Sequence, residues 1–117
     1  MLKGRVAVIV SGATGVGAAM ARCLGGLGAS VVITYSPDEL PERVVSKIVE
    51  SGGDALTFQS AMISSDDYKQ ALAFANTELG HVDLFFNNAR DYPSGAVAKT
   101  EDEYLAEFLE DFHLAAA

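Results

Sequence analysis

The chain has 117 residues, half of them hydrophobic, and its 8 basic and 16 acidic residues give a net charge of −8. This composition predicts one folded domain over residues 1–117 and excludes a disordered chain. The negative charge disfavours nucleic acid and anionic membranes as partners, and no apolar run approaches the roughly 20 residues of a membrane span. With no signal-peptide pattern and a single cysteine, Cys23, we expect a cytoplasmic protein without disulfides or a metal site.

Strands and helices are expected to alternate from the start of the chain. The continuous apolar run of residues 5–10 is typical of a strand buried on both faces. An apolar helical stripe follows over residues 15–27, and Gly28 ends it. Ser30–Tyr35 reads as a second buried strand. A helix then starts near Pro41, because proline fits the first turn of a helix better than its interior.

The rest of the chain continues this alternation. The second helix is expected to turn its valines and isoleucine toward the sheet: Val44, Val45, Ile48 and Val49. A strand over 55–59, a helix from Ser64 to Gly80 and a strand over 82–86 follow. After a loop over 91–99, Thr100–Glu103 has the capping-box pattern that opens a last helix.

The alternation predicts an α/β fold, with a parallel sheet between helices on both faces. Right-handed crossovers and a glycine turn after the first strand favour the strand order 3-2-1-4. We therefore expect a three-layer, Rossmann-like half-domain.

The glycine-rich stretch SGATGVG lies between the first strand and the first helix. Glycines there permit a tight turn and the close approach of a pyrophosphate, while the helix N-terminus supplies free N–H groups and partial positive charge. A tight turn without a ligand is the alternative. The candidate phosphate contacts are Ser11, Gly12, Thr14, Gly15, Val16 and Gly17.

The stretches GRVAVIVSGATGVGAAMARCLGGLGASVVITY and GHVDLFFNNA resemble the N-terminal half of a short-chain dehydrogenase/reductase. The likeness covers nearly the whole chain and is greatest to NADPH-dependent ketoreductases, including fungal polyketide reductases. It implies NADP(H) as a cofactor, with contacts from the end of the second strand and from the Asn-Asn-Ala motif: Tyr35, Ser36, Asn87, Asn88 and Ala89. No acidic residue follows the second strand at Tyr35–Ser36, which favours NADP(H) over NAD(H).

Several departures from the family pattern predict that cofactor binding is weak or lost. The glycine motif is one residue short between its first two glycines. Ala61 stands where the family has an adenine-contacting aspartate, and Arg90 replaces the glycine of the Asn-Asn-Ala-Gly motif. His113 aligns with a helix asparagine that holds a catalytic water in the family.

The family's redox chemistry needs a tyrosine with a lysine four residues later, and no tyrosine of this chain has one. We therefore expect a truncated or divergent family member without its own ketoreductase activity that binds a small-molecule ligand. Two alternatives stay open. One is a non-redox enzyme, such as a cyclase, isomerase or dehydratase, with His113, Asp91 and Tyr92 as acid–base groups. The other is a regulatory subunit that pairs with a full-length relative.

The resemblance also predicts assembly, because the family's fourth strand is interior and its next helix forms the dimer interface. Here the fourth strand would be an apolar edge, and such edges invite another chain. We expect a homodimer, or a complex with a relative, through the last helix. Its apolar residues are Tyr104, Leu105, Phe108, Leu109 and Phe112.

Overall fold

Strands and helices alternate along the whole described chain. The computed structural model describes residues 1–87 and 100–116, with the side chains of the last helix described as far as Glu110. The elements are β1 (Val6–Val10), α1 (Gly15–Gly26), β2 (Ser30–Tyr35), α2 (Glu42–Glu50), β3 (Asp54–Gln59), α3 (Ser65–Glu78), β4 (Leu84–Asn87) and α4 (Glu101–Ala116). The expected α/β alternation is confirmed, and the bounds fall within a residue or two of those expected.

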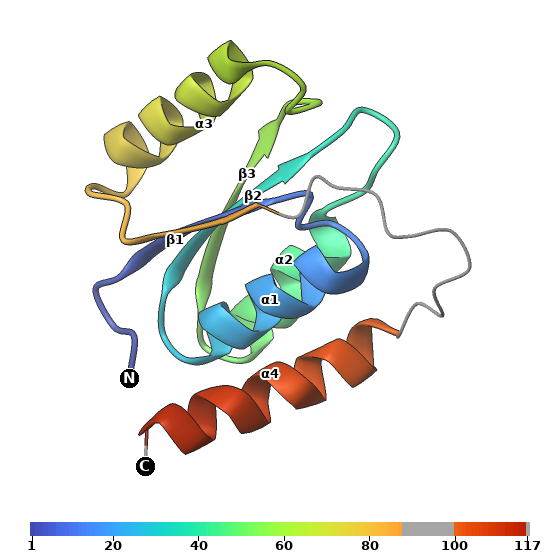
Figure 1. Cartoon of the computed structure of the whole chain (residues 1–117), viewed down its shortest axis with the longest axis vertical. Coiled ribbons are helices and arrows are strands. Elements are labelled where there is room, and N and C mark those ends of the chain that lie inside the picture. Colours follow the sequence, from blue (N-terminus) through green and yellow to red (C-terminus); the bar gives the residue numbers. More distant parts are fainter. Residues whose placement is uncertain (88–99, 117) are drawn as a thin grey trace.

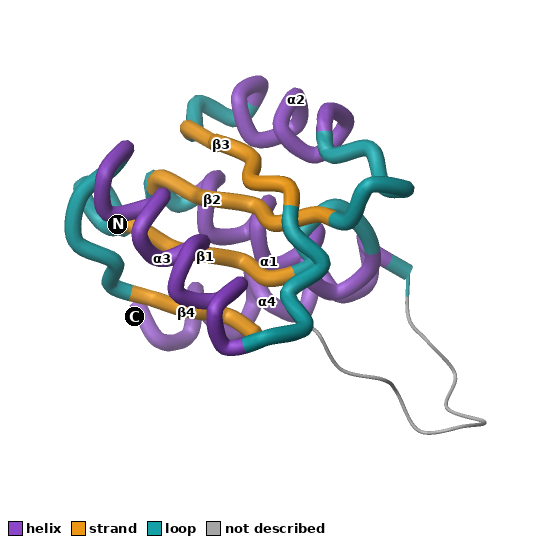
Figure 2. Tube along the Cα trace, turned by 90° about the horizontal axis from the view of Figure 1, so that it is seen from above, coloured by secondary structure: helices purple, strands orange, loops and turns teal. Residues whose placement is uncertain are grey.

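The four strands form one parallel sheet in the order β3-β2-β1-β4, which confirms the predicted 3-2-1-4 order. Figure 2 shows them as a single layer between helices. The register places Val8 of β1 beside Val32 of β2 and Phe85 of β4. The residues of β1 are all buried, because helices cover both faces of the sheet at its centre.

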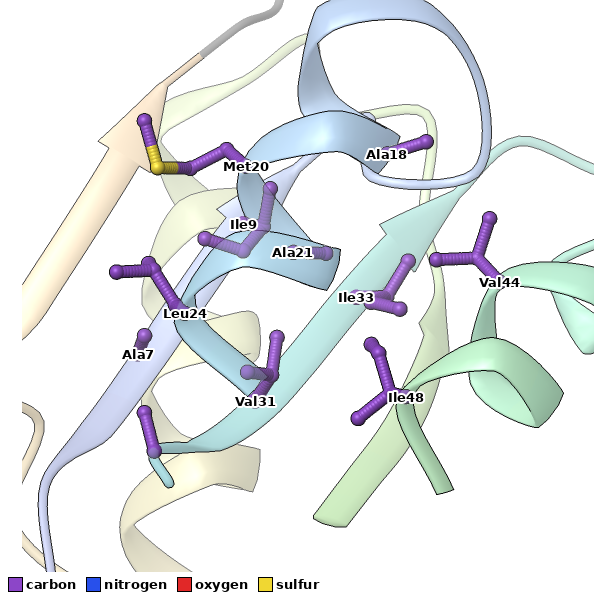
Figure 3. Packing of buried hydrophobic residues seen from close by; sticks show 11 residues of the cluster. Ala7, Ile9, Ala18, Met20, Ala21, Leu24, Val31, Ile33, Val44 and Ile48 are labelled. Atoms are coloured by element: carbon purple, nitrogen blue, oxygen red, sulfur yellow. The ribbon is translucent and has the colours of Figure 1, made fainter. Parts of the chain in front are cut away.

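The helices divide unequally between the two faces (Figure 1). On one face α3 packs over Val8 and Val32. On the other face α1 and α2 cover Ile9 and Ile33, and Figure 3 shows Leu24 of α1 and Ile48 of α2 among the side chains of that core. Successive strand residues point to opposite faces, so each apolar strand contributes side chains to the hydrophobic cores on both faces of the sheet.

Local capping chemistry sets where two of the helices begin. The Ser64 hydroxyl accepts the Asp67 N–H at 3.2 Å, and the Asp67 carboxylate accepts the Ser64 N–H at 3.2 Å, which is a reciprocal capping box at the start of α3. Thr100 and Glu103 make the same pair of bonds at the start of α4, each at 3.1 Å. The expected capping box of the last helix is therefore confirmed.

Helix α2 differs from the expectation on one face. Val44 and Ile48 are fully buried, as predicted, but Val49 is 56% exposed. The nine residues of α2 make only two and a half turns. Only a narrow stripe of the helix therefore contacts the sheet, and Val49 lies outside that stripe. The prediction that Val49 faces the sheet is wrong.

Helix α4 lies against α1, on the face of the sheet that α1 and α2 cover (Figure 1). Phe108 of α4 packs against the core that contains Ile9 and Leu24. Helix α1 thus lies between the sheet and α4, which explains why most of its residues are buried rather than one stripe alone. Part of the apolar surface that the sequence assigned to a partner is therefore used inside the chain.

Among the described residues, no helix is both long and apolar enough to cross a membrane. Cys23 is a buried free thiol on α1. Burial raises the pKa of this thiol to about 11, so the reactive thiolate is scarce at neutral pH.

Candidate functional site

The glycine turn lies at the carboxyl end of β1, where the chain leaves the sheet to enter α1. The connections from β1 lead to β2 on one side, while β4 on its other side is reached only through α3. In open α/β sheets, ligands bind outside the carboxyl ends of the strands at this reversal of strand order. The topology therefore puts the predicted phosphate contacts at the expected ligand crevice.

The first half of the glycine turn, Ser11 and Gly12, is held by hydrogen bonds to β2. The Ser11 N–H donates to the Thr34 hydroxyl at 3.0 Å, and the Gly12 N–H donates to the Thr34 carbonyl at 3.1 Å. A Cβ on Gly12 would lie 2.8 Å from Cγ2 of Ile33 and 3.3 Å from the backbone oxygen of Ile9. Gly12 is thus required for packing against the core, whether or not a ligand is bound.

The second half of the turn has the geometry of an anion cradle. Gly15 has a φ of +59°, and a Cβ built there would meet no atom within 4 Å. The Ala18 N–H makes the first helical bond, to the Thr14 carbonyl at 3.2 Å. The N–H groups of Val16 and Gly17, which precede Ala18, have no hydrogen-bond partner within the helix. Thr14 is the N-cap residue but its side chain makes no cap.

These features fit a phosphate. Open space lies beside Gly15, uncapped N–H groups point out of the helix, and the helix dipole favours a negative charge there. Residues on the glycine turn could therefore hold the pyrophosphate of a dinucleotide.

A carboxylate lies next to this cradle. Instead of capping α1, the Thr14 hydroxyl donates to Oε2 of Glu39 at 3.3 Å. The other oxygen of Glu39 accepts the Ser36 N–H at 2.8 Å and the Ser36 hydroxyl at 3.0 Å. The glycine turn and the loop after β2 are joined through this one side chain. Sequence reasoning missed Glu39 as a site residue, although Ser-x-x-Glu over residues 36–39 is a pattern in which the glutamate side chain reaches back to the first residue's N–H.

The remaining residues after β2 are also hydrogen-bonded. The Tyr35 hydroxyl donates to Oε1 of Gln59 on β3 at 3.5 Å. The Ser36 hydroxyl lies 2.7 Å from Oδ1 of Asp38, and this bond lowers the pKa of the Asp38 carboxyl below its usual range. Asp38 and Glu39 thus bring negative charge to the position where the sequence indicated an NADP(H) contact.

The other predicted site residues are spread more widely. Asn87 ends β4, in register with Val10 of β1. Helix α4 runs from the carboxyl edge of the sheet toward the edge where the N-terminus lies, so its C-terminal end points away from the glycine turn (Figure 1). His113 belongs to this C-terminal part of the helix. Ala61 follows β3 and is exposed. Five residues named from the sequence lie outside the described part of the chain: Asn88, Ala89, Arg90, Asp91 and Tyr92.

Comparison with known proteins identifies the family. The model of the short chain dehydrogenases matches residues 5–110. This chain belongs to the short-chain dehydrogenase family. Members of the family typically bind NAD(P). Two relatives from Emericella nidulans, a short chain dehydrogenase and a versicolorin reductase, are each 34% identical over 105 residues, covering 88% of this chain and 40% of the relative.

Solved structures agree with this assignment. A short-chain dehydrogenase/reductase from Serratia marcescens matches with a TM-score of 0.73 and 25% identity, over 94% of this chain and 51% of that one. A dehydrogenase/reductase from Sinorhizobium meliloti matches with a TM-score of 0.72 and 29% identity, over 89% and 43%. The chain therefore spans about 40% of the length of its curated relatives and about half of these structures, and it has the fold of the N-terminal part of a Rossmann domain.

Proposed function

We propose that this chain is a dinucleotide-binding member of the short-chain dehydrogenase family that holds its ligand mainly by the phosphates. The observation that carries the proposal is the open, uncapped half of the glycine turn around Gly15. Family membership supports it, since family members typically bind NAD(P). Binding is weak, because Ala61 supplies no carboxylate to the adenine and the turn is one residue short.

We further propose that the 117-residue chain does not reduce ketones by itself. The family's proton relay needs a tyrosine and a lysine four residues later, and the four tyrosines are followed at that spacing by Glu39, Leu72, Ala96 and Phe108. The cytoplasmic location expected from the sequence stays a prediction.

Calorimetric titration with NADH and NADPH tests the binding proposal. Gly15→Val should abolish binding, because the side chain fills the space that the pyrophosphate needs. Gly52→Val is the matched control, since Gly52 also has a positive φ, of +89°, and open surroundings, but lies in the turn after α2. Both variants carry similar backbone strain. Wild-type protein that binds neither nucleotide at millimolar concentration, or a Gly15→Val variant that binds as wild type does, would refute the proposal.

We also propose a homodimer built on the outer edge of β4 and on the exposed apolar surface of α4. Among the described residues β4 pairs with β1 alone, and Leu84 of β4 is 42% exposed. The charge of Asp83 does not block pairing of another strand at this edge, because its carboxylate accepts the Val6 N–H at 2.9 Å and so turns toward β1. A two-fold axis would pair β4 with its copy. Leu109 of α4, 43% exposed, adds apolar surface on the helix that the family resemblance assigns to the interface.

Light scattering measures this assembly. Leu84→Glu and Leu109→Glu should each shift the protein toward monomer, whereas Leu40→Glu, at a site that is 78% exposed, should not. A monodisperse wild-type monomer at tens of micromolar would overturn the proposal.

A further inference from the structure

The loop between β2 and α2 fixes one carboxylate between the two segments that meet the adenosine half of a dinucleotide. Glu39 accepts the hydroxyl of Thr14, in the glycine turn, at 3.3 Å. It also accepts the N–H and the hydroxyl of Ser36, directly after β2, at 2.8 and 3.0 Å. In dinucleotide folds the glycine turn contacts the pyrophosphate, and the end of β2 contacts the adenosine ribose. Glu39 therefore lies at the junction of the two subsites.

The charge at this junction is not neutralised within the described chain. Across residues 1–87 and 100–116, Glu39 takes part in none of the ion pairs. Arg43, the first arginine after it in the sequence, pairs instead with Glu101 of α4. Asp38 adds a second carboxylate, whose Oδ1 lies 2.7 Å from the Ser36 hydroxyl and shares that hydroxyl's one proton with Glu39. A phosphate group placed here would face two carboxylates.

We propose that Glu39 makes this site select NAD(H) over NADP(H). The inference rests on the proposed function, that the glycine turn binds a dinucleotide. A carboxylate accepts hydrogen bonds from the free 2′-hydroxyl of the NAD(H) ribose, and it repels the 2′-phosphate of NADP(H). Glu39 follows the glycine turn by about 20 residues, the separation at which an acidic residue reaches the ribose in such folds.

This assignment reverses the preference inferred from the sequence. That inference considered only Tyr35 and Ser36, where no acidic residue stands. In the structure the backbone turns back after β2, and the Ser36 N–H holds the Glu39 side chain beside the end of the strand. The carboxylate thus reaches the ribose position from three residues further along the loop.

The experiment measures the dissociation constants of NADH and NADPH by calorimetry, for the wild type and for Glu39→Gln. Glutamine keeps the size and the hydrogen-bond acceptor but removes the charge. Wild-type protein should bind NADH at least about ten-fold more tightly than NADPH, as a like-charge contact at a binding site predicts. In Glu39→Gln this gap should close, through tighter NADPH binding and little change for NADH. Glu42→Gln, an exposed site three residues along, removes the same charge and should leave the gap intact.

The outcomes separate this inference from the proposal on which it rests. Wild-type protein that binds NADPH as tightly as NADH overturns the role of Glu39 and leaves dinucleotide binding standing. A preference for NADH that survives in Glu39→Gln assigns the selection to other residues and also overturns it. Failure of the wild type to bind either nucleotide at millimolar concentration overturns both. Thermal melts of the variants without ligand show that each is folded before it is titrated.

Discussion

Of the three ion pairs that join α4 to α1 and α2 among the described residues, two share one residue, Glu101. Its carboxylate accepts Nη1 of Arg22 at 2.6 Å and both terminal nitrogens of Arg43. The side chains of Glu101 and Arg22 are only 15% and 17% exposed, whereas that of Arg43 is 52% exposed. Glu101→Gln removes the charge while keeping the shape, so it leaves the Arg22 guanidinium partly buried without its closest partner.

The expected loss in the free energy of unfolding is about 2 kcal/mol. Exposed pairs such as Arg43–Glu101 contribute roughly 0–1 kcal/mol, whereas removing one partner of a fully buried pair costs about 3–5 kcal/mol. The Arg22–Glu101 pair lies between these limits, and Asp102, 3.0 Å from Arg22, replaces part of the lost interaction. A chain of this length has an unfolding entropy of about 0.25 kcal/mol/K, so the midpoint should fall by about 8 °C.

Thermal unfolding followed by circular dichroism measures the shift, and hydrogen exchange of α4 peptides locates it. Asp102→Asn is the matched control, because the Asp102 side chain is 85% exposed and also bonds Arg22; we expect less than about 0.5 kcal/mol there. A Glu101→Gln midpoint within 2 °C of wild type (about 0.5 kcal/mol), with unchanged exchange in α4, would show that these ion pairs do not hold the helix.

The same variant has a defined pH dependence. Although burial raises the pKa of Glu101, the hydrogen bonds from Arg43 and Arg22 outweigh it, and the pKa lies below its ordinary value of 4.5. A lowered carboxyl pKa stabilises the fold above the unfolded pKa, and that stability is lost as pH falls through the folded pKa. The gap between wild type and Glu101→Gln should therefore be constant from pH 6 to 8 and should shrink below about 4.5.

Three further expectations can be checked with the same protein. Gly12→Ala should destabilise the fold by about 1–3 kcal/mol in a thermal melt, since its Cβ would lie 2.8 Å from Cγ2 of Ile33; a midpoint equal to wild type would contradict this. Cys23, buried and with its pKa raised to about 11, should react with an aromatic disulfide reagent at pH 8 only after unfolding, so a rate equal to that of denatured protein would count against it. Purified chain should show no NADH or NADPH oxidation with ketone substrates, because it lacks a relay typically worth about 10²–10⁴-fold; a robust rate would overturn this.

The helix starts could be predicted because local chemistry determines them, and the strand order could be predicted because right-handed crossovers and the glycine turn restrict it. The apolar run of β1 requires burial on both faces, and the capping boxes at Ser64 and Thr100 mark where helices begin. The side-chain contacts of the candidate site could not be predicted in the same way. The bond between Thr14 and Glu39 joins residues 25 apart, and no local pattern states that the two segments meet.

The packing of α4 against α1 was not predicted for a related reason, although the sequence of α1 contained one indication of it. Helix α1 carries small residues around most of its circumference, and its alanines Ala18, Ala19 and Ala21 are all fully buried. A helix that is apolar all round packs against more than one neighbour. The amphipathic stripe on α4 predicts that the helix packs against something but not against what. Its position on α1 is set by contacts between distant residues, namely Phe108 against the core and Glu101 with Arg22 and Arg43.

The position of α4 bears on how another strand can join the sheet. The steps from β1 to β2 and from β2 to β3 put α1 and α2 on one face, and the reverse step from β3 to β4 puts α3 on the other. By the same right-handed rule, a helix leading to a further parallel strand beside the outer edge of β4 belongs on the face of α3. Helix α4 instead lies on the face of α1. If α4 were the helix of such a crossover, it would have to leave α1 and break its ion pairs. A strand from a second copy requires no such move, so the proposed dimer is compatible with α4 as it stands.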